Sequence, residues 1–251
     1  HRVDRRQRQM CIRDRNGNDT IIKERLYGLT GHDGNHGEDC KELYYYLDNT
    51  PTHSYMKYLY KYPQAKFPYT RMLMENRNRS KKDREYELLD TGVFDDNKYF
   101  DVYVEYAKEG PEDISIKITA TNRGEEDAEL TLLPTLWFRN LWSFGVSKHK
   151  GSITKIEGLK GFKGVKAAHH RIGTFNLYYE QPQEELFTEN ETNMERIFGI
   201  ENASPFVKDL INDSVVSGIY TTIDKKSEGT KFSPTFSGKI KGGESKVVKL
   251  R

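Results

Sequence analysis

The amino-acid sequence predicts a mainly β protein, an antiparallel β-sandwich with one or two short helices. Apolar and polar residues alternate with period two in the middle of the chain, which is typical of strands with one buried face. Turn signals rich in glycine and proline separate many short segments of this kind. The regular alternation of helices and strands that a doubly wound nucleotide-binding fold requires is absent from the sequence.

The first third of the chain predicts strands and one helix. Residues 21–27 have a strand pattern, and a glycine-rich loop follows over residues 28–37. Residues 43–48 and 53–62 are aromatic-rich strands on either side of a turn at Pro51. Residues 68–80 are the best helix candidate, with three consecutive apolar residues and a polar second half.

The clearest strands lie in the centre, over residues 100–106 and 114–120, and the pattern resumes at 130–132. A one-residue slip would reverse every side chain, so the register is strongly specified. We expect one buried face and one face toward solvent or a partner domain. The buried residues are Val102, Val104, Ile116, Ile118, Leu130 and Leu132, and the outward residues are Asp101, Glu105, Lys117 and Thr119.

Shorter strands follow, and many short strands with turn signals favour a sandwich. They are expected over residues 153–156, 165–168, 175–179, 232–240 and 247–250.

Both ends of the chain have unusual sequences. Residues 1–15 are rich in arginine and show no periodicity, and Met10 to Arg15 resembles the translation of a transposon-end adapter used in DNA library preparation. We therefore expect residues 1–15 to be foreign, with few contacts to the sandwich, and the native domain to cover residues 16–251. The alternative is a basic arm that binds nucleic acid. Residues 245–251 stop in mid-strand, which predicts a truncation there as well.

Composition excludes several classes of protein. The net charge is +2 from 40 basic and 38 acidic side chains, so no domain-wide basic field favours nucleic acid. No apolar run approaches the roughly 20 residues of a membrane span. The two cysteines, Cys11 and Cys40, give no disulfide framework. The cytoplasm is the favoured compartment, and a signal peptide stays an alternative because the native N-terminus is expected to be missing.

Long stretches of the chain resemble one family. They are KERLYGLTGHDGNHGEDCKELYYYLDNTPTHSYMKYLYKYPQAKFPY (23–69), ELLDTGVFDDNKYFDVYVEYAK (87–108), LLPTLWFRNLWSFG (132–145), LFTENETNMERIFG (186–199) and ASPFVKDLINDSVV (203–216). From residue 16 onward the chain resembles the N-terminal domain of large bacterial members of glycoside hydrolase family 63, the mannosyl-oligosaccharide glucosidases and mannosylglycerate hydrolases. It departs from that pattern at His32-Asp33, where relatives have Pro-Glu, and at Cys40, where they have Val.

The resemblance implies a β-sandwich of the super-sandwich type that precedes an (α/α) barrel. The barrel would hold the two catalytic acids and would lie beyond this chain, so the fragment alone is expected to be inactive. The implied reaction is inverting hydrolysis of α-linked glucosides or mannosides, in oligosaccharides or small glycosides, without an organic cofactor. The expected partner of this chain is that barrel, in the same polypeptide.

Inverting hydrolysis needs an acid and a base whose carboxyl groups lie about 6.5–9.5 Å apart. Two pairs of carboxylates are close in the sequence. Glu38 and Asp39 are adjacent and would face opposite ways in a strand, whereas Glu189 and Glu191 could share a face. Because the resemblance implies catalytic residues in the missing barrel, we expect none in this chain, and solvated or turn-capping carboxylates are the alternative to a catalytic role.

The polar loop over residues 31–39 contains residue types that bind metals, but its spacing matches neither an EF-hand nor H-E-x-x-H. We therefore expect no metal, and a loop packed against the barrel, at the rim of its active site or between the domains. The candidate residues of this loop are His32, Asn35, His36, Glu38 and Asp39.

Aromatic residues cluster after the central strands. Trp137, Arg139 and Trp142, with Phe138 and Phe144 beside them, are candidates for a sugar-stacking platform, while burial in the sandwich or at a domain interface is favoured for large aromatic rings. An exposed line of rings would instead indicate a free-standing carbohydrate-binding module. A large uncovered apolar patch would indicate a structural or interaction domain.

Overall fold

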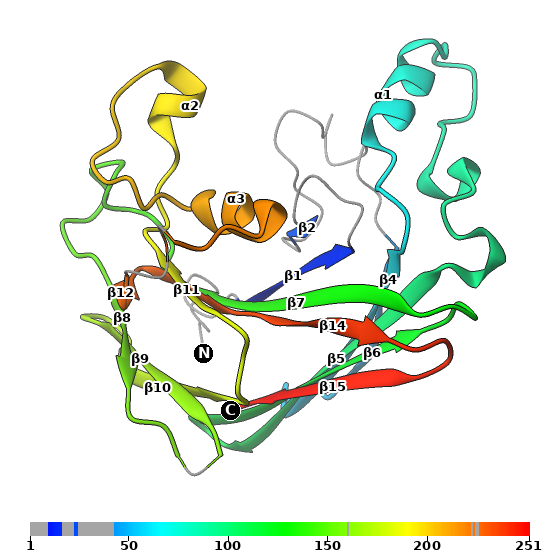
Figure 1. The fold of residues 1–251 in the computed structure, drawn as a ribbon. Coiled ribbons are helices and arrows are strands. Elements are labelled where there is room, and N and C mark those ends of the chain that lie inside the picture. The colour runs from blue at the N-terminus through cyan, green and yellow to red at the C-terminus, as the bar shows by residue number, and fades with distance from the viewer. Residues whose placement is uncertain (1–9, 17–22, 25–42, 160, 222, 224–225) are drawn as a thin grey trace.

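The computed structural model describes residues 10–16, 23–24, 43–159, 161–221, 223 and 226–251. Antiparallel strands form two stacked sheets in this part of the chain, as Figure 1 shows, so the predicted mainly β fold is confirmed. The two sheets enclose one large hydrophobic core, and the helices lie around the sheets rather than between them.

The larger sheet has nine strands in the order β12-β8-β9-β10-β15-β6-β5-β4-β3. The strands predicted at 43–48, 53–62, 100–106, 114–120, 153–156, 165–168, 175–179 and 247–250 all belong to it. The bounds are β3 (Tyr44–Asn49), β4 (Tyr55–Pro63), β5 (Tyr99–Gly110), β6 (Asp113–Asn122), β8 (Ser152–Ile156), β9 (Lys163–His169), β10 (Gly173–Tyr179), β12 (Glu228–Gly229) and β15 (Ser245–Leu250).

The smaller sheet has six strands in the order β11-β13-β7-β1-β2, with β14 also paired to β7. The strand predicted at 232–240 is two strands, because the pairing with β7 is interrupted after Phe232 and resumes at Phe236 in the same register. The bounds are β1 (Met10–Asn16), β2 (Lys23–Glu24), β7 (Ala128–Trp137), β11 (Glu185–Thr188), β13 (Lys231–Pro234) and β14 (Phe236–Ile240).

The expectation that residues 1–15 make few contacts with the sandwich is wrong for the described part of that segment. Strand β1 pairs with β7 from Met10↔Leu136 to Asn16↔Leu130. Backbone N–H and C=O groups at a strand edge pair with an extended segment whatever side chains it carries. The foreign origin of the segment therefore stays a prediction. Of the strand expected over residues 21–27, only β2 lies within the described residues.

Three α-helices lie against the sheets in the part of the chain that the structure describes. The predicted helix at 68–80 is confirmed as α1 (Tyr69–Arg77), whose Met72 packs in a satellite cluster with Phe67, Tyr86 and Leu88. Helices α2 (Met194–Phe198) and α3 (Leu210–Ser217) are not predicted from the sequence. Short 3-10 turns follow α1 at η2 (Leu88–Thr91) and η3 (Asp95–Asn97).

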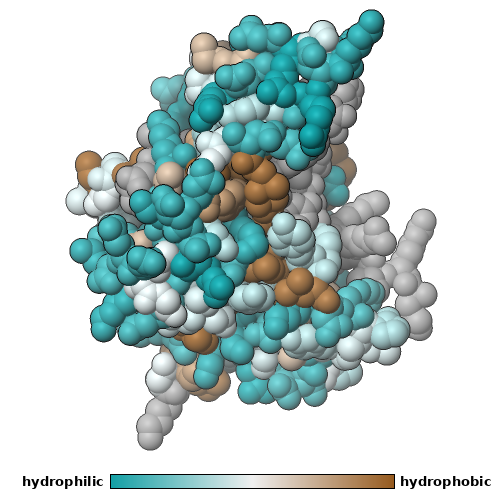
Figure 2. All heavy atoms as spheres, turned by 90° about the vertical axis from the view of Figure 1, so that its right-hand side faces the viewer, coloured by the Kyte–Doolittle hydropathy of each residue, from teal (hydrophilic) through white to brown (hydrophobic). Residues whose placement is uncertain are grey.

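Helix α3 packs on the six-stranded sheet. Its Ile211 and Val215 form a second cluster with Leu133 of β7 and Leu186 of β11, so α3 covers the side of that sheet that faces away from the main core. Figure 1 shows α2 and α1 at opposite sides of the molecule. Figure 2 views the molecule from the side of α1 and shows a largely hydrophilic surface with hydrophobic side chains gathered near its middle.

The predicted register of the central strands is confirmed. All six residues expected to be buried are at most 6% exposed and belong to the main core. Four of them lie on β5 and β6, whereas Leu130 and Leu132 reach the same core from β7 in the opposite sheet. The alternation therefore specified the buried face correctly but could not show that the chain changes sheets after Asn122.

The residues predicted to point away from the core do so, with one qualification in their exposure. Lys117 is exposed, and Glu105 and Thr119 are half-buried. Asp101 is only 7% exposed, because Lys61 and Arg123 cover its carboxylate with Nζ–Oδ1 and Nε–Oδ2 distances of 2.7 Å and 3.5 Å. An outward-facing carboxylate is thus buried beneath its own ion pairs.

Asn122 joins the two sheets at one end of the sandwich. This fully buried side chain donates from Nδ2 to the carbonyl oxygens of Glu126 and Ile240, each at 2.8 Å. Its Oδ1 accepts from the backbone N–H of Gly124 at 2.9 Å and from Nε2 of Gln64 at 2.6 Å. One amide therefore holds the end of β4, the β6–β7 turn and the end of β14 together.

Candidate functional site

A largely buried polar cluster surrounds Glu189, directly after β11. Its Oε1 accepts from Nζ of Lys226 at 2.7 Å, and its Oε2 accepts from the Thr230 hydroxyl at 2.9 Å and from Nζ of Lys150 at 2.8 Å. The Glu189 side chain is 12% exposed and that of Lys226 16%. Three donors from distant parts of the chain thus hold one nearly buried carboxylate.

Glu191 extends this cluster to an aromatic ring. Its Oε1 accepts from the indole N–H of Trp142 at 2.6 Å and lies 3.5 Å from Nζ of Lys150. The Lys150 ammonium also lies 5.7 Å from the centroid of the Trp142 ring, within the range of a cation–π contact. Glu189 and Glu191 therefore share one lysine, as their spacing in the sequence allowed.

The environment of Glu189 favours the ionised carboxylate. Burial by itself would raise the pKa of Glu189, but the hydrogen bonds from Lys150, Lys226 and Thr230 outweigh it and lower that pKa below its usual value. For Lys150, burial acts to lower the pKa, and the contacts with Glu189 and Glu191 raise it overall. Both partners thus stay charged at neutral pH.

The lowered pKa of Glu189 predicts a specific dependence of stability on pH. A carboxylate with a depressed folded-state pKa stabilises the protein above its unfolded-state pKa, about 4.3, and this contribution is lost as pH falls through the folded-state pKa. We expect the difference in unfolding free energy between the wild type and Glu189→Gln to have its largest value at pH 7 and to decrease below pH 4. Urea melts of both proteins across this range test it, and a difference that grows on acidification would contradict it.

Histidines and an aromatic ring lie next to this cluster. The ring of Phe138 stacks on His169 at a centroid distance of 5.4 Å, and His170 lies 4.4 Å from His169 and 4.0 Å from His149. Burial, with additional repulsion from neighbouring His149 and Arg171, lowers the pKa of His169. The interplanar angles are 22° for Phe138–His169, 47° for His169–His170 and 32° for His149–His170, so only the first of these pairs is stacked.

The structure separates the aromatic residues that the sequence places together. Trp137 and Phe138 are 9% and 8% exposed, whereas Phe144 is 70% exposed. Trp142 is half-buried against Glu191, and Arg139 is exposed. The expected burial is thus found for the first two rings, and the five residues do not form one exposed line. His32, Asn35, His36, Glu38 and Asp39 lie outside the described residues.

Sequence reasoning identified Glu189, Glu191 and Trp142 but missed Lys150, Lys226 and Thr230. Lys150 and Lys226 lie in polar segments among many other lysines, and nothing in their local pattern distinguishes them. The network is also not arranged for acid catalysis at Glu189, because a general acid needs a raised pKa. Its geometry instead fits a structural ion-pair network that fixes the segment after β11.

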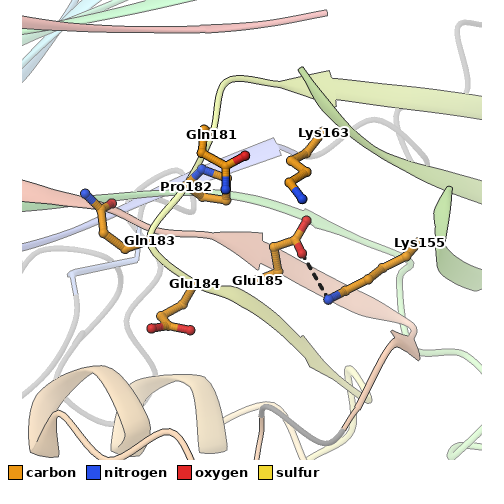
Figure 3. Close-up of a pocket in the computed structure, with 7 residues that line it drawn as sticks. All are labelled: Lys155, Lys163, Gln181, Pro182, Gln183, Glu184 and Glu185. Atoms are coloured by element: carbon orange, nitrogen blue, oxygen red, sulfur yellow. Dashed lines mark ion pairs between the residues drawn. The ribbon is translucent and has the colours of Figure 1, made fainter. Parts of the chain in front are cut away.

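A polar cavity of about 180 Å³ lies elsewhere, between β8, β9 and the segment that joins β10 to β11 (Figure 3). An ion pair between Lys155 and Glu185, 2.9 Å long, forms part of its wall, and Tyr179 donates to the same carboxylate at 2.5 Å. Ligand pockets usually measure about 300–1,000 Å³, so this cavity is small. Its lining comprises Lys155, Lys163, Gln181, Pro182, Gln183, Glu184 and Glu185.

Among the described residues, no group of three or more His, Cys, Asp or Glu side chains is placed to hold a metal ion. None of the helices described here has the length and apolar character needed to cross a membrane.

Comparisons with known proteins give one clear sequence relative. The uncharacterized protein YMR196W of Saccharomyces cerevisiae is 37% identical over 269 residues, which cover 94% of this chain. The same match covers 25% of the yeast protein, so the chain spans about a quarter of its relative's length. No family model matches the chain.

A solved structure, the polysaccharide lyase BACCELL_00875, aligns with 96% of this chain and 24% of its own, with a TM-score of 0.38 and 10% sequence identity. A similarity this low does not bear on function.

Proposed function

We propose that this chain is the accessory β-sandwich domain of a larger glycosidase, which hydrolyses α-linked glucosides or mannosides by an inverting mechanism. The observation that carries the proposal is the coverage of the yeast relative: nearly the whole chain aligns with only a quarter of that protein. A segment with its own two-sheet core that recurs within a much longer polypeptide is typical of one domain among several.

The resemblance to the N-terminal domain of glycoside hydrolase family 63 supplies the class of reaction. In this proposal the catalytic pair lies in an (α/α) barrel of the same polypeptide. The sandwich supports that barrel through its loops. Residues 31–39 and the region of Trp137, Arg139 and Trp142 are the proposed contacts at the rim of the active site or between the domains.

The hydrogen bonds of Glu189 and Glu191 favour a structural role, rather than a catalytic role, for the sandwich. Glu189 uses both of its oxygens to hold Lys150, Lys226 and Thr230, and Glu191 accepts from Trp142. A water molecule or a glycosidic oxygen would have to displace these partners before either carboxylate could act on it. Stabilisation of the loop after β11 is therefore the role their contacts favour.

This proposal predicts that the 251-residue chain alone does not hydrolyse α-glucosides or mannosylglycerate. Aryl α-glucosides, α-linked glucose disaccharides and mannosylglycerate are suitable substrates, with release of free sugar as the readout. The complete protein encoded by the same gene should show turnover under the same conditions. Turnover by the chain alone that disappears in Glu189→Gln or Glu38→Gln would contradict the proposal, because it would place the active site in the sandwich.

A further inference from the structure

Helix α2 exposes side chains of the kind that a helix normally buries. None of its residues is buried, and Ile197, Phe198 and Ile200, the last of which follows the helix, are 58%, 62% and 56% exposed. Single exposed apolar residues are ordinary on a protein surface. Three of them within four consecutive positions are not, and we call these three residues the apolar tip.

Polar contacts, rather than the burial of an apolar face, hold α2 in place. Asn193 Oδ1 accepts from the backbone N–H of Arg196 at 3.0 Å, and Asn202 Oδ1 accepts from that of Met194 at 2.8 Å. The Arg196 guanidinium donates to Asp209 at 2.8 Å. A five-residue helix is not stable alone in water, and most protein helices gain their stability from a packed apolar face. In α2 the polar side makes these contacts, which leaves the apolar tip available.

Helix α1 has the usual arrangement and shows the contrast. Its Met72 is 4% exposed and packs against Phe67, Tyr86 and Leu88, while Met74 on the same helix is 61% exposed. One exposed methionine is therefore an ordinary surface residue of a helix that buries another. Helix α2 has no buried residue of this kind.

Two further exposed apolar residues lie on the segment between β7 and β8. Phe144 and Val146 are 70% and 71% exposed. The indole of Trp142, two residues before Phe144, donates to Glu191, three residues before the start of α2 at Met194. This hydrogen bond brings the two exposed segments to the same region of the molecule.

We propose that the apolar tip docks against another part of the same polypeptide, outside these 251 residues. The inference rests on one element of the proposed function, that the chain is a domain of a longer protein. The yeast relative gives the argument from length, since the chain matches only 25% of it. A surface in the attached remainder has an effective concentration on the order of millimolar, so it would cover the tip before a second copy of the chain could.

The chemistry of the region favours an apolar protein surface over a polyanion. Residues 191–213 contain five acidic and two basic side chains, and one of the basic groups, Arg196, is paired with Asp209 and Asp213. Nucleic acids and anionic lipid headgroups bind basic surfaces, so this acidic region repels them. Isoleucine and phenylalanine side chains are stabilised by burial against other apolar groups, and phenylalanine is enriched at protein interfaces. The expected partner surface is apolar, with basic residues around it.

Phe198→Gln tests the proposal in two proteins, the 251-residue chain and the complete protein encoded by the same gene. In the chain alone Phe198 is exposed, so the melting temperature should change by no more than about 2 °C. In the complete protein the variant would lose a buried ring and bury an amide, so the melting transition of the sandwich should fall by at least about 4 °C. Met74→Gln is the matched control, because Met74 is 61% exposed on α1, at the opposite side of the molecule (Figure 1), and it should be neutral in both proteins. Equal shifts for Phe198→Gln in the two proteins would overturn the proposal.

Hydrogen–deuterium exchange of the two wild-type proteins needs no substitution. The amides of Ile197, Gly199 and Ile200 donate to backbone carbonyls within the α2 segment, and they should exchange at least about tenfold more slowly in the complete protein. Unchanged exchange would contradict the proposal. So would a dimer of the 251-residue chain that Phe198→Gln converts to a monomer in light scattering, because the occupant would then be a second copy. None of these readouts measures hydrolysis, so a complete protein that protects α2 without cleaving glycosides would refute the proposed glycosidase activity and support the docking of the tip.

Discussion

Replacing Ile116 with alanine is expected to lower the free energy of unfolding by about 2–5 kcal/mol, the usual range for a large-to-small change in a core. Ile116 is 6% exposed and belongs to the main core. It lies between Tyr106 on β5 and Leu250 on β15, its cross-strand partners. Because strands flank it on both sides, the cavity left by the missing atoms cannot close easily. Denaturant melts of the wild type and the variant measure the effect.

The matched control is the next residue along β6. Lys117→Ala should change stability by no more than about 0.5 kcal/mol, as for ordinary surface substitutions. The Lys117 side chain is 50% exposed, and its ion pair with Glu105 lies on the outer face, where such pairs contribute little. If Lys117→Ala proves the more damaging change, the register of β6 is wrong, and the assignment of the inner and outer faces is wrong with it.

Replacing Glu189 with leucine is expected to cost about 3–5 kcal/mol, the range for removing one partner from a buried ion pair. The Lys226 side chain, only 16% exposed, would keep its charge without the carboxylate at 2.7 Å. The Thr230 hydroxyl, 1% exposed as a residue, would lose its acceptor at 2.9 Å.

A double variant separates the ion pair from simple packing. Glu189→Leu combined with Lys226→Met removes both charges, so it should be less destabilising than Glu189→Leu alone. Glu201→Gln, at an exposed carboxylate in the same region of the sequence, serves as the control and should have little effect. If the double variant loses as much unfolding free energy as Glu189→Leu and Lys226→Met lose together, Glu189 and Lys226 do not interact.

The strands of the nine-stranded sheet, except the two-residue β12, could be predicted from their apolar patterns. Strand β6 alternates between buried and less buried residues from Ile116 to Asn122, and β5 places Phe100, Val102 and Val104 on the buried face. Strand β11 was missed because it is only four residues long and three of these are buried, so it shows no period. The sheet to which each strand belongs could not be predicted either. An alternation with period two shows which side chains of a strand are buried, but it does not show which strand lies beside it.

The two missed helices depend on contacts that are remote in sequence. Helix α2 has five residues, too few for a periodic pattern. It is held by an Asn193 cap and by Arg196, which pairs with Asp209 and Asp213. The candidate site has the same origin. Glu189 and Lys150 are separated by 39 positions, and only the folding of β8 beside β12 brings the lysine to the carboxylate.

The junction at Asn122 limits how the sequence of this protein can vary in length. The β14–β15 turn lies so close to the β6–β7 turn that a Cβ added at Gly242 would come within 2.1 Å of the Glu125 carbonyl oxygen. An inserted residue in either turn would separate the carbonyl groups that the Asn122 amide joins. Relatives should therefore keep both turns at constant length. Insertions and new binding loops should instead accumulate at the far end of β7, after Trp137.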